Sequence, residues 1–478
     1  RFGRRDRYGE VNAEVSDGSL IQVRPSNVTA FEIDLARCPI DTAEAVAVTV
    51  DGVPVFTDMV SARSRLRLAR AGPRWQVGFT PPGLQKKPGL EGPVSDVFTG
   101  PFLVVVGTQS PEAFDRRILE KEAQRFAADW ELRYTKPPRV KLDHEVTPED
   151  IADHHLVLYG GPNDNTVTAR INDRLPVRVR NGAVEVGAHR VYRGEGLAAK
   201  LCYPNPLNAE RLAVVIAGAG RARDIFQSNN LFGNWFQWGP YDNRTWFDYA
   251  VFDRKSRSAE TCLEFGFFGH DWRLCGETTW FGDPSARAEA PARRVPRHTV
   301  PPAGRKIVYL SDLLPVSIDQ HKMPVGFDTS AEGRPLSVGP ADASRRVFRR
   351  GLGVHAPSKI TFRLHGPETP PAERFHRFRA TVGIDLEGER QVSQWRKKKE
   401  WVQFFVRGDG HLLYRTGRMK WNSKPVDIDV PVSRVEELEL QVWCTNARWL
   451  VGSAAWGSAR VIRQKAPGPD DAPADPGS

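Results

Sequence analysis

Long apolar runs, paired cysteines and catalytic motifs are all scarce in this chain. No stretch of about 18 uninterrupted apolar residues occurs, so the sequence predicts no membrane-spanning helix. The five cysteines include no C-x-x-C pair, which argues against a zinc finger or a thioredoxin-like motif. Cys262 and Cys275 are candidates for one disulfide, and buried thiols are the alternative. The cysteines therefore leave the redox compartment undecided.

The signatures of common hydrolases are also missing. The chain contains no G-x-S-x-G nucleophile elbow, and the segment that begins like H-E-x-x-H at His144 lacks its second histidine. Asp143, His144, His154 and His155 form a polar cluster in the sequence, for which surface or capping roles compete with a metal or acid–base role. No pair of carboxylates stands out as a glycosidase dyad. The sequence therefore identifies no catalytic residue and no metal ligand. Whether the chain is an enzyme stays open, and a non-catalytic chain is the favoured interpretation.

What is present is the composition of a multidomain globular protein. The 478 residues suffice for about three domains, and hydrophobic residues make up 40% of them. Prolines at close intervals argue against helix and strand between 284 and 304. The predicted segments are a β-rich unit at 1–100, an α/β domain at 101–283, a proline-rich linker at 284–304, a β-sandwich at 305–463 and a disordered tail at 464–478. The fold class is therefore a combination of α/β and all-β domains.

Strand-like and helix-like patterns alternate in the predicted α/β domain. Residues 102–106 form an apolar run typical of a strand covered on both faces, and a helical pattern follows from 111 to 130. Thr147 and Pro148 form a helix-start signal before a second apolar run at 156–159. This alternation predicts a three-layer domain with a parallel sheet. An aromatic-rich stretch at 234–246 is a candidate ligand-facing loop.

An ordered set of short motifs built on Gly, His and Asp runs through residues 305–463. The motifs are Tyr309-Leu310-Ser311-Asp312, Gly326-Phe327-Asp328-Thr329-Ser330, Gly351-Leu352-Gly353-Val354-His355-Ala356, Ala380-Thr381-Val382-Gly383-Ile384-Asp385, Val406-Arg407-Gly408-Asp409-Gly410 and Pro425-Val426-Asp427-Ile428-Asp429-Val430. In these motifs the region resembles the NPCBM family, a carbohydrate-binding module often attached to bacterial glycoside hydrolases. The resemblance implies a galactose-binding-like jelly-roll sandwich that binds a glycan without converting it.

A second set of phrases covers residues from about 10 to 283. They are Pro25-Ser26-Asn27-Val28-Thr29, Val50-Asp51-Gly52, Lys87-Pro88-Gly89-Leu90-Glu91-Gly92-Pro93-Val94, Tyr203-Pro204-Asn205-Pro206-Leu207 and Asp248-Tyr249-Ala250-Val251-Phe252-Asp253. Here the chain resembles the non-catalytic tail of bacterial secreted prolyl-oligopeptidase-like proteins. The resemblance implies a hydrolase domain upstream of Arg1 and a secreted, periplasmic or cell-surface location. The alternative function is an α/β hydrolase-type enzyme (peptidase, esterase or glycoside hydrolase) whose catalytic residues are unrecognised or lie upstream.

The C-terminal region departs from the NPCBM pattern at three places. Ala455 precedes Trp456 where the family commonly has an acidic residue, and Leu386 follows Asp385 where a second acid is common. A basic stretch is inserted at 395–401. These differences weaken the case for a bound calcium ion or polar sugar contacts at these positions. We therefore expect no cofactor, with a structural calcium ion in the sandwich as the alternative.

Tryptophans and polar side chains in loops are the candidate ligand-binding residues. A sugar ring stacks its apolar C–H face on an aromatic plane, and its hydroxyls bind charged or amide groups. Trp443, in an alternating strand, and Trp456 are expected in the core. A buried position for His355 and a turn-capping role for Asp385 are the alternatives to binding. The predicted carbohydrate-binding set is Trp421, Asn422, Trp449, Arg448, His355 and Asp385.

Most of the positive charge lies in the same region. Residues 306–463 contain 26 Lys and Arg against 17 Asp and Glu, in a chain of net charge +10. The basic runs at 345–350 and 396–399 are solvated loops in the simplest interpretation, and an anionic partner is the functional one. Nucleic acid ranks last because these runs lack interleaved aromatic residues. The expected partners are a polysaccharide or glycan, and an upstream hydrolase domain.

Overall fold

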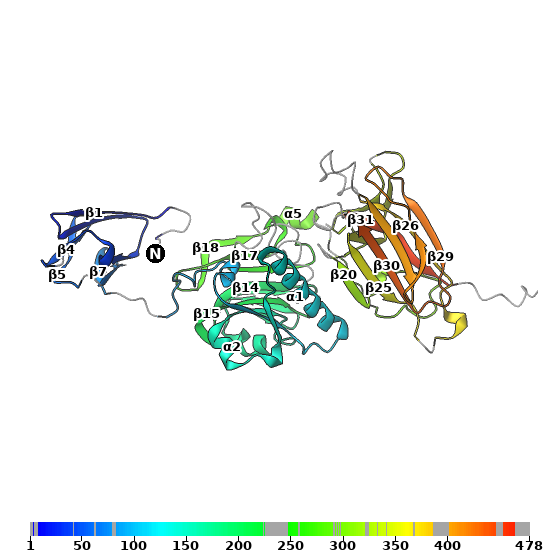
Figure 1. Ribbon diagram of the computed structural model, residues 1–478, viewed down its shortest axis with the longest axis horizontal. Helices are drawn as coiled ribbons and strands as arrows, with labels where there is room; N and C mark the ends of the chain where they lie inside the picture. Colours follow the sequence, from blue (N-terminus) through cyan, green and yellow to red (C-terminus); the bar gives the residue numbers. More distant parts are fainter. Residues whose placement is uncertain are drawn as a thin grey trace, which may run out of the picture. The chain divides into compact units, whose positions relative to one another are not determined.

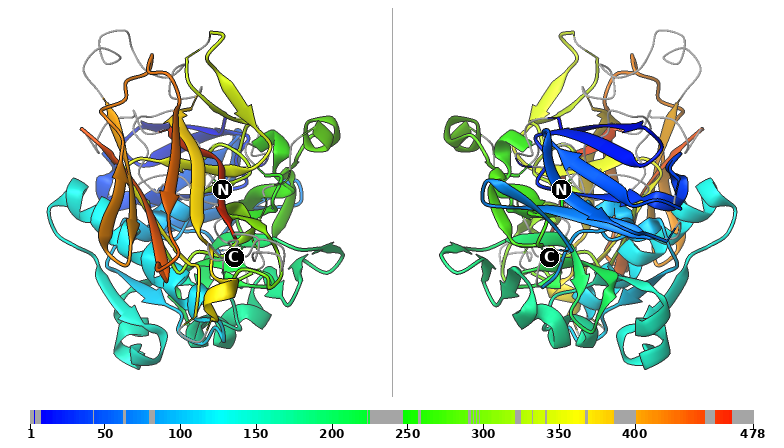
Figure 2. Two further views of the ribbon diagram at one scale, coloured as in Figure 1. Left: turned by 90° about the vertical axis from the view of Figure 1, so that its right-hand side faces the viewer. Right: turned by 90° about the vertical axis from the view of Figure 1, so that its left-hand side faces the viewer.

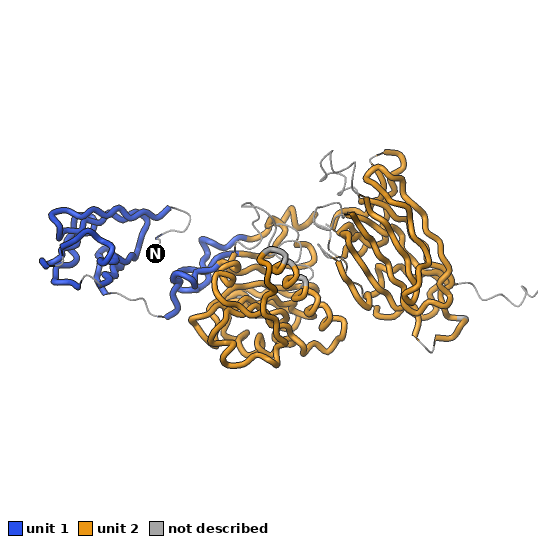
Figure 3. Tube along the Cα trace, in the orientation of Figure 1, with its two compact units in different colours: residues 1–92, 266–280 blue, residues 93–265, 281–478 orange. Residues whose placement is uncertain are grey.

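The structure is a computed structural model of the chain. It describes residues 3, 8–41, 43–61, 64–78, 83–222, 224, 247–256, 259–289, 292, 294, 296, 298–320, 325–331, 333–340, 342–366, 369–385, 401–445 and 453–463. The chain forms two compact units, one of residues 1–92 with 266–280 and one of residues 93–265 with 281–478 (Figure 3). Within the described ranges, no helix is long and apolar enough to cross a membrane.

The N-terminal residues form two small sheets around an apolar core. The first contains β1 (Glu10–Ser16), β2 (Leu20–Ser26), β4 (Val46–Val50) and β5 (Val53–Asp58). The second contains β3 (Ala30–Asp34), β6 (Arg65–Ala71) and β7 (Arg74–Val77). Asp51 and Gly52 join β4 to β5 with φ angles of 54° and 78°, the left-handed pair that a tight hairpin turn requires.

The central sheet is mixed. Its eight strands follow the order β18-β17-β16-β14-β15-β10-β8-β9. Their bounds are β8 (Phe102–Val106), β9 (Arg139–Leu142), β10 (His155–Tyr159), β14 (Ala198–Asn205), β15 (Asn208–Gly218), β16 (Tyr249–Phe252), β17 (Glu264–Phe268) and β18 (Leu274–Phe281). Strands β9, β8, β10 and β15 are parallel, as predicted, but β14 pairs antiparallel with both β15 and β16. The expectation of a parallel sheet is wrong for these strands because a tight hairpin, not a helix, joins β14 to β15.

Three helices accompany the parallel strands: α1 (Ala113–Tyr134), α2 (Pro148–Asp153) and α3 (Thr166–Ile171). Helix α1 (labelled in Figure 1) packs on β8 and β10. It buries Ile118 and Phe126. Thr147 caps α2 as predicted, because its hydroxyl accepts the Asp150 N–H at 3.2 Å while the Asp150 carboxylate accepts the Thr147 N–H at 2.9 Å.

A three-stranded sheet of β11 (Val177–Arg180), β12 (Ala183–Val186) and β13 (Arg190–Arg193) was not predicted. It is connected to the central sheet through Glu264, which is fully buried. The Glu264 carboxylate accepts hydrogen bonds from Arg190 at 2.8 and 3.0 Å, from the Tyr192 hydroxyl at 2.7 Å and from the Tyr249 hydroxyl at 2.8 Å. Burial, followed by the bond to Glu264, raises the pKa of Tyr192. The cluster satisfies a buried charge that would otherwise destabilise the fold.

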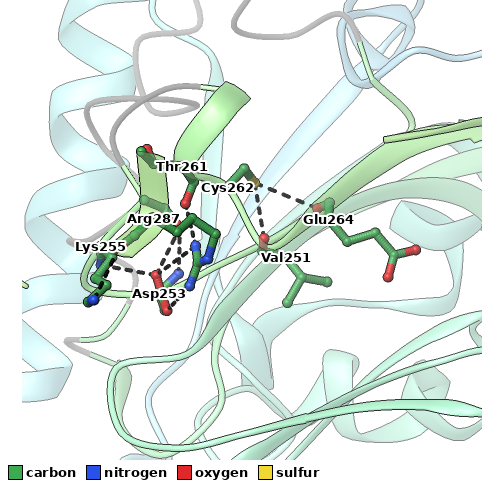
Figure 4. Close-up of polar contacts among 8 residues, drawn as sticks. Val251, Asp253, Lys255, Thr261, Cys262, Glu264 and Arg287 are labelled. Atoms are coloured by element: carbon green, nitrogen blue, oxygen red, sulfur yellow. Dashed lines mark hydrogen bonds and ion pairs between the residues drawn. The ribbon is translucent and has the colours of Figure 1, made fainter. Parts of the chain in front are cut away.

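The first residues of the predicted linker are helical. The expectation that 284–304 contains no helix is wrong for α5 (Pro284–Glu289). Pro284 occupies the first turn, where a missing N–H costs little, and Asp283 accepts the Ala286 N–H at 2.7 Å. Arg287 anchors the helix by its 2.7 Å ion pair with Asp253, and the Lys255 ammonium donates to the Arg287 carbonyl at 3.1 Å (Figure 4).

All five cysteines are free thiols, so Cys262 and Cys275 form no disulfide; Cys262 is a buried thiol as the alternative expected, whereas Cys275 is only partly buried. The Cys262 thiol donates to the Val251 carbonyl at 3.0 Å (Figure 4). Burial raises the pKa of Cys262 to about 12. This cysteine is therefore a small buried side chain of low reactivity.

The C-terminal domain is a sandwich of two antiparallel sheets (Figure 1 and Figure 2). The first sheet has the order β21-β24-β31-β26-β29, with β19 also paired to β31, and the second has the order β20-β25-β30-β27-β28. The apolar core between them includes Trp456, which is fully buried as predicted. The bounds are β19 (Ile307–Tyr309), β20 (Ser317–Gln320), β21 (Gly326–Phe327), β24 (Gly351–His355), β25 (Ser358–Arg363), β26 (Arg377–Ile384), β27 (Val402–Gly408), β28 (His411–Arg415), β29 (Val426–Pro431), β30 (Glu437–Cys444) and β31 (Ser453–Ile462).

A hairpin of β22 (Leu336–Val338) and β23 (Arg346–Phe348) packs on the first sheet. Its apolar side chains form a small cluster with Ala455. A Cβ at Gly457 would lie 2.5 Å from the Phe348 ring, so any larger residue here would have to displace that ring. Ala455 replaces the acid common in the family, and an acid here would be buried in the apolar cluster.

The basic run at 345–350 is partly structural, contrary to its interpretation as a solvated loop. Arg346 binds both oxygens of Asp427, at 2.7 and 2.8 Å, and so ties the hairpin to β29. Arg350 forms ion pairs with Asp312 and Asp328. Arg294, from the predicted linker, pairs with the same two carboxylates. These four alternating charges attach the linker to the sandwich.

Candidate functional site

Strand register brings the predicted polar residues to one end of the sandwich. His355, the last residue of β24, pairs with Ser453 at the start of β31. The Asp385 N–H, just beyond β26, donates to the Ser453 carbonyl at 3.0 Å. His355, Ser453 and Asp385 therefore lie on three neighbouring strands at the same edge. We call this edge of the domain the loop end.

The second sheet contributes tryptophans to the loop end. Only Ala356 and Pro357 separate the end of β24 from the start of β25, so β25 begins at this end. Strand β25 pairs antiparallel with β30, and β30 pairs antiparallel with β27. The end of β30, with Trp443, and the start of β27, preceded by Trp401, therefore lie at the loop end as well.

The predicted binding residues differ in accessibility. His355 and Asp385 are buried, with 5% and 2% of their surfaces exposed, so they form the wall of the loop end. Trp421 is half-buried and Asn422 exposed, in a turn closed by the Lys420 N–H bond to the Ser423 hydroxyl at 2.9 Å. This turn precedes β29, whose Val426 pairs with Val382 near the end of β26. The structure therefore brings Trp421 and Asn422 to the same end as His355 and Asp385.

Two predicted residues, Arg448 and Trp449, lie outside the described residues, as do the basic run at 396–399 and the aromatic stretch at 234–246. Their roles stay predictions. The whole of the predicted C-terminal tail, 464–478, lies outside the described residues too.

The expectation for Trp443 is wrong. Its side chain is 45% exposed, whereas Val442 and Cys444 on either side are buried. Because side chains alternate between the two faces of a strand, Trp443 points away from the core. Its ring lies 5.2 Å from that of Trp401, and the Arg418 guanidinium lies 4.3 Å above the Trp401 ring. Sequence reasoning missed Arg418, and the alternation in β30 was the signal that places Trp443 outside.

No metal centre is visible among the described side chains: three or more His, Cys, Asp or Glu residues nowhere gather as ligands would. In the sequence cluster of Asp143 and three histidines, only His144 is near Asp143 among the described contacts, with its Nδ1 3.7 Å from the carboxylate, and no set of three ligands forms. The Asp143 carboxylate accepts bonds from the Thr108 hydroxyl and the Thr166 N–H, each at 2.7 Å. Burial alone would raise the pKa of Asp143, but these bonds leave it lowered. His155 accepts the Leu212 N–H at 2.8 Å, and burial lowers its pKa.

The carboxyl-terminal edge of the parallel strands is where α/β domains commonly bind ligands. At that edge the described chain approaches itself closely at two glycines. A Cβ at Gly107 would lie 2.4 Å from the Asp164 carbonyl oxygen, and one at Gly218 would lie 2.1 Å from the Arg221 carbonyl oxygen. In this described portion, the loop end of the sandwich is therefore the stronger candidate site.

Comparisons with known proteins concern the C-terminal domain. The NPCBM/NEW2 domain model matches residues 306–462. A protein of Renibacterium salmoninarum named "Putative endo-alpha-N-acetylgalactosaminidase" is 26% identical over 175 residues, which are 34% of this chain and 10% of that protein. The chain thus spans about a tenth of the length of this relative.

Two solved structures from Clostridium perfringens are also similar. One is CBM51 from GH95 in complex with methyl-galactose, with 22% identity, a TM-score of 0.28, and coverage of 33% of this chain and 99% of that one. The other contains CBM51-2 in complex with GlcNAc and the INT domains of ZmpB, with 26% identity, a TM-score of 0.28, and coverage of 33% and 32%. Residues 306–462 of this chain therefore form an NPCBM/NEW2 domain.

Proposed function

We propose that the loop end of the C-terminal domain binds a glycan, and that the chain is a non-catalytic part of a secreted bacterial protein associated with a hydrolase. The observation that carries the proposal is the register that brings His355, Asp385 and the Trp421 turn to one edge of the sandwich. The NPCBM match of this domain and the name of the Renibacterium relative support the same class of ligand.

In this proposal the accessible residues contact the sugar and the buried residues support them. Trp421 offers an aromatic plane to the C–H face of a sugar ring, and Asn422 offers amide groups to its hydroxyls. The buried His355 and Asp385 hold the wall behind them. Trp449 and Arg448 are proposed to complete the site. One or two stacked rings supply about 1–2 kcal/mol each, so affinities from micromolar to millimolar are expected.

The finer parts of the proposal rest on resemblance. The N-terminal residues, to about 283, are proposed to be the tail of a prolyl-oligopeptidase-like protein with its hydrolase domain upstream. In such a protein the weak glycan affinity keeps a tethered catalytic domain near its polymer. A secreted, periplasmic or cell-surface location follows from this arrangement.

The test is binding of the full 478-residue chain to a broad array of glycans. We expect selective binding, weakened at least tenfold by the double variant Trp421→Ala, Trp449→Ala, which corresponds to about 1.4 kcal/mol. Trp280→Ala is the matched control because Trp280 is an exposed tryptophan of the central sheet, with 43% of its surface exposed. Binding to no glycan on the array, or binding that the double variant leaves unchanged, would contradict the proposal.

A further inference from the structure

The outer face of the second sheet carries an aromatic surface of its own. Trp401 and Trp443 form a pair with ring centroids 5.2 Å apart and an interplanar angle of 43°. Gln403 pairs with Trp443 across the strands, so both side chains lie on the same outer face. Two residues further along β27, away from the loop end, Phe405 pairs with Gln441 of β30 on one side and Arg415 of β28 on the other. We call Trp401, Trp443, Gln403, Phe405 and Gln441 the outer platform.

Two arginines border the outer platform. Arg418 stacks its guanidinium 4.3 Å above the Trp401 ring, and Arg415 is an exposed residue of β28 paired with Phe405. A guanidinium that lies flat on an indole still presents its in-plane N–H donors at its edge. Neither arginine has an ion pair with a carboxylate in the described chain. Both side chains are exposed, so a negatively charged group from outside the domain can reach them.

Charges on the rest of this face are compensated. Glu439 pairs with Lys359 at 2.8 Å and with Arg407 at 3.7 Å, and Glu437 pairs with Arg363 at 2.9 Å. Arg415 and Arg418 lie apart from these ion pairs, near the end that carries the two tryptophans. An isolated exposed tryptophan needs no explanation, but a tryptophan pair next to amides and two open guanidiniums has the chemistry of an acidic sugar site.

From this arrangement we infer that the outer platform binds a carboxylate-bearing sugar residue of an acidic polysaccharide. The C–H face of the ring stacks on Trp443, and the Gln441 amide and the Gln403 amide oxygen lie beside it for the hydroxyls. The Gln403 amide nitrogen already donates to the Thr416 carbonyl at 2.6 Å. The carboxylate meets Arg418, whose planar fork matches its two oxygens. The inference rests on the proposed glycan binding by this domain, but it adds a second surface and the chemical class of the ligand.

The test uses one polymer in two charge states. Binding of the full chain is measured to polygalacturonate and to the same polymer after methyl esterification, which removes the charge and keeps the sugar rings. We expect at least tenfold tighter binding to the charged form. Trp443→Ala should weaken binding to the charged form about tenfold, and Arg418→Gln should remove most of the preference for the charged form. Trp280→Ala and Arg273→Gln are the exposed controls, which should change neither value.

Dextran sulfate separates specific recognition from simple attraction between opposite charges. Equal affinity for dextran sulfate and polygalacturonate, lost for both at about 0.5 M salt, would overturn the inference. So would equal affinity for the charged and esterified polymers, or binding that Trp443→Ala does not weaken. If glycans still bind and Trp421→Ala weakens them while Trp443→Ala does not, the proposed function stands and this inference fails. If no glycan binds at all, both fail.

Discussion

Acidification should destabilise the C-terminal domain through one buried histidine. His365 follows β25 and is only 2% exposed, with its ring stacked on Phe375 at a centroid distance of 5.7 Å. Burial, followed by the nearby positive charges of Arg374 and Arg463, lowers the pKa of His365 from 6.5 to about 4. The Val432 backbone and then the Asp409 carboxylate act on this pKa in the opposite direction. The folded domain therefore favours the neutral imidazole.

The sign and size of the effect follow from linkage between protonation and folding. Unfolding frees the imidazole to bind a proton below its ordinary pKa of 6.5. The contribution to stability is therefore fully present above pH 6.5 and is lost as the pH falls toward 4. Between about pH 7.5 and about pH 5 the loss is about 2 kcal/mol. For a domain of this size that corresponds to a fall of about 6 °C in its unfolding temperature.

Calorimetry of the full chain at the two pH values measures this loss. His365→Gln removes the titrating group, so the fall in the C-terminal transition should be smaller by about 6 °C in this variant. His411→Gln, at an exposed position on β28, is the matched control and should fall as the natural sequence does. An identical pH dependence in His365→Gln and the natural chain would refute the reasoning, whatever the absolute stability of the variant.

Two further substitutions test the packing of the other regions. Glu264→Gln removes the buried charge that Arg190 and two tyrosines bind, and we expect a loss of about 3 kcal/mol in the urea unfolding of the central domain; a loss below about 1 kcal/mol would contradict this role. Gly457→Val should cost about 3 kcal/mol, because its side chain would overlap the Phe348 ring. Gly417→Val is its control, since a Cβ at Gly417 meets nothing within 4 Å, and equal unfolding temperatures for the two variants would count against the argument.

Local signals in the sequence anticipated local structure well. The helix-start signal at Thr147 and the apolar run at 102–106 appear as a capped helix and a buried strand. Pairing between distant segments was harder to foresee. The hairpin from β14 to β15 turns at Pro206, where the Asn205 side chain accepts the Leu207 N–H at 3.0 Å, and this turn makes β14 antiparallel to β15. A turn held by one amide side chain has little signature in hydrophobic periodicity.

The candidate site was predictable only in part, because its local motifs could be read from the sequence but the pairing between its strands could not. Motif order was enough to expect a sandwich, and residues at strand ends such as His355 and Asp385 fell together at one edge. Trp443 was misplaced because its size outweighed the period-two pattern in which Leu438, Leu440 and Val442 face inward. The stacking of Arg418 on Trp401 joins residues from two strands and needs the register to be known.

Arg294 has a practical consequence for anyone who wishes to study the sandwich alone. The homology match begins at Lys306, and an excised fragment starting there would look complete by sequence. Such a fragment would leave Asp312 and Asp328 facing each other with Arg350 as their sole remaining counter-charge among the described contacts. It would also lose the bond from the Leu314 N–H to the His298 carbonyl at 2.7 Å. A fragment that starts a dozen or more residues earlier keeps both the Arg294 ion pairs and the Leu314–His298 hydrogen bond. Weak or absent sugar affinity in a shorter fragment would reflect the loss of these interactions.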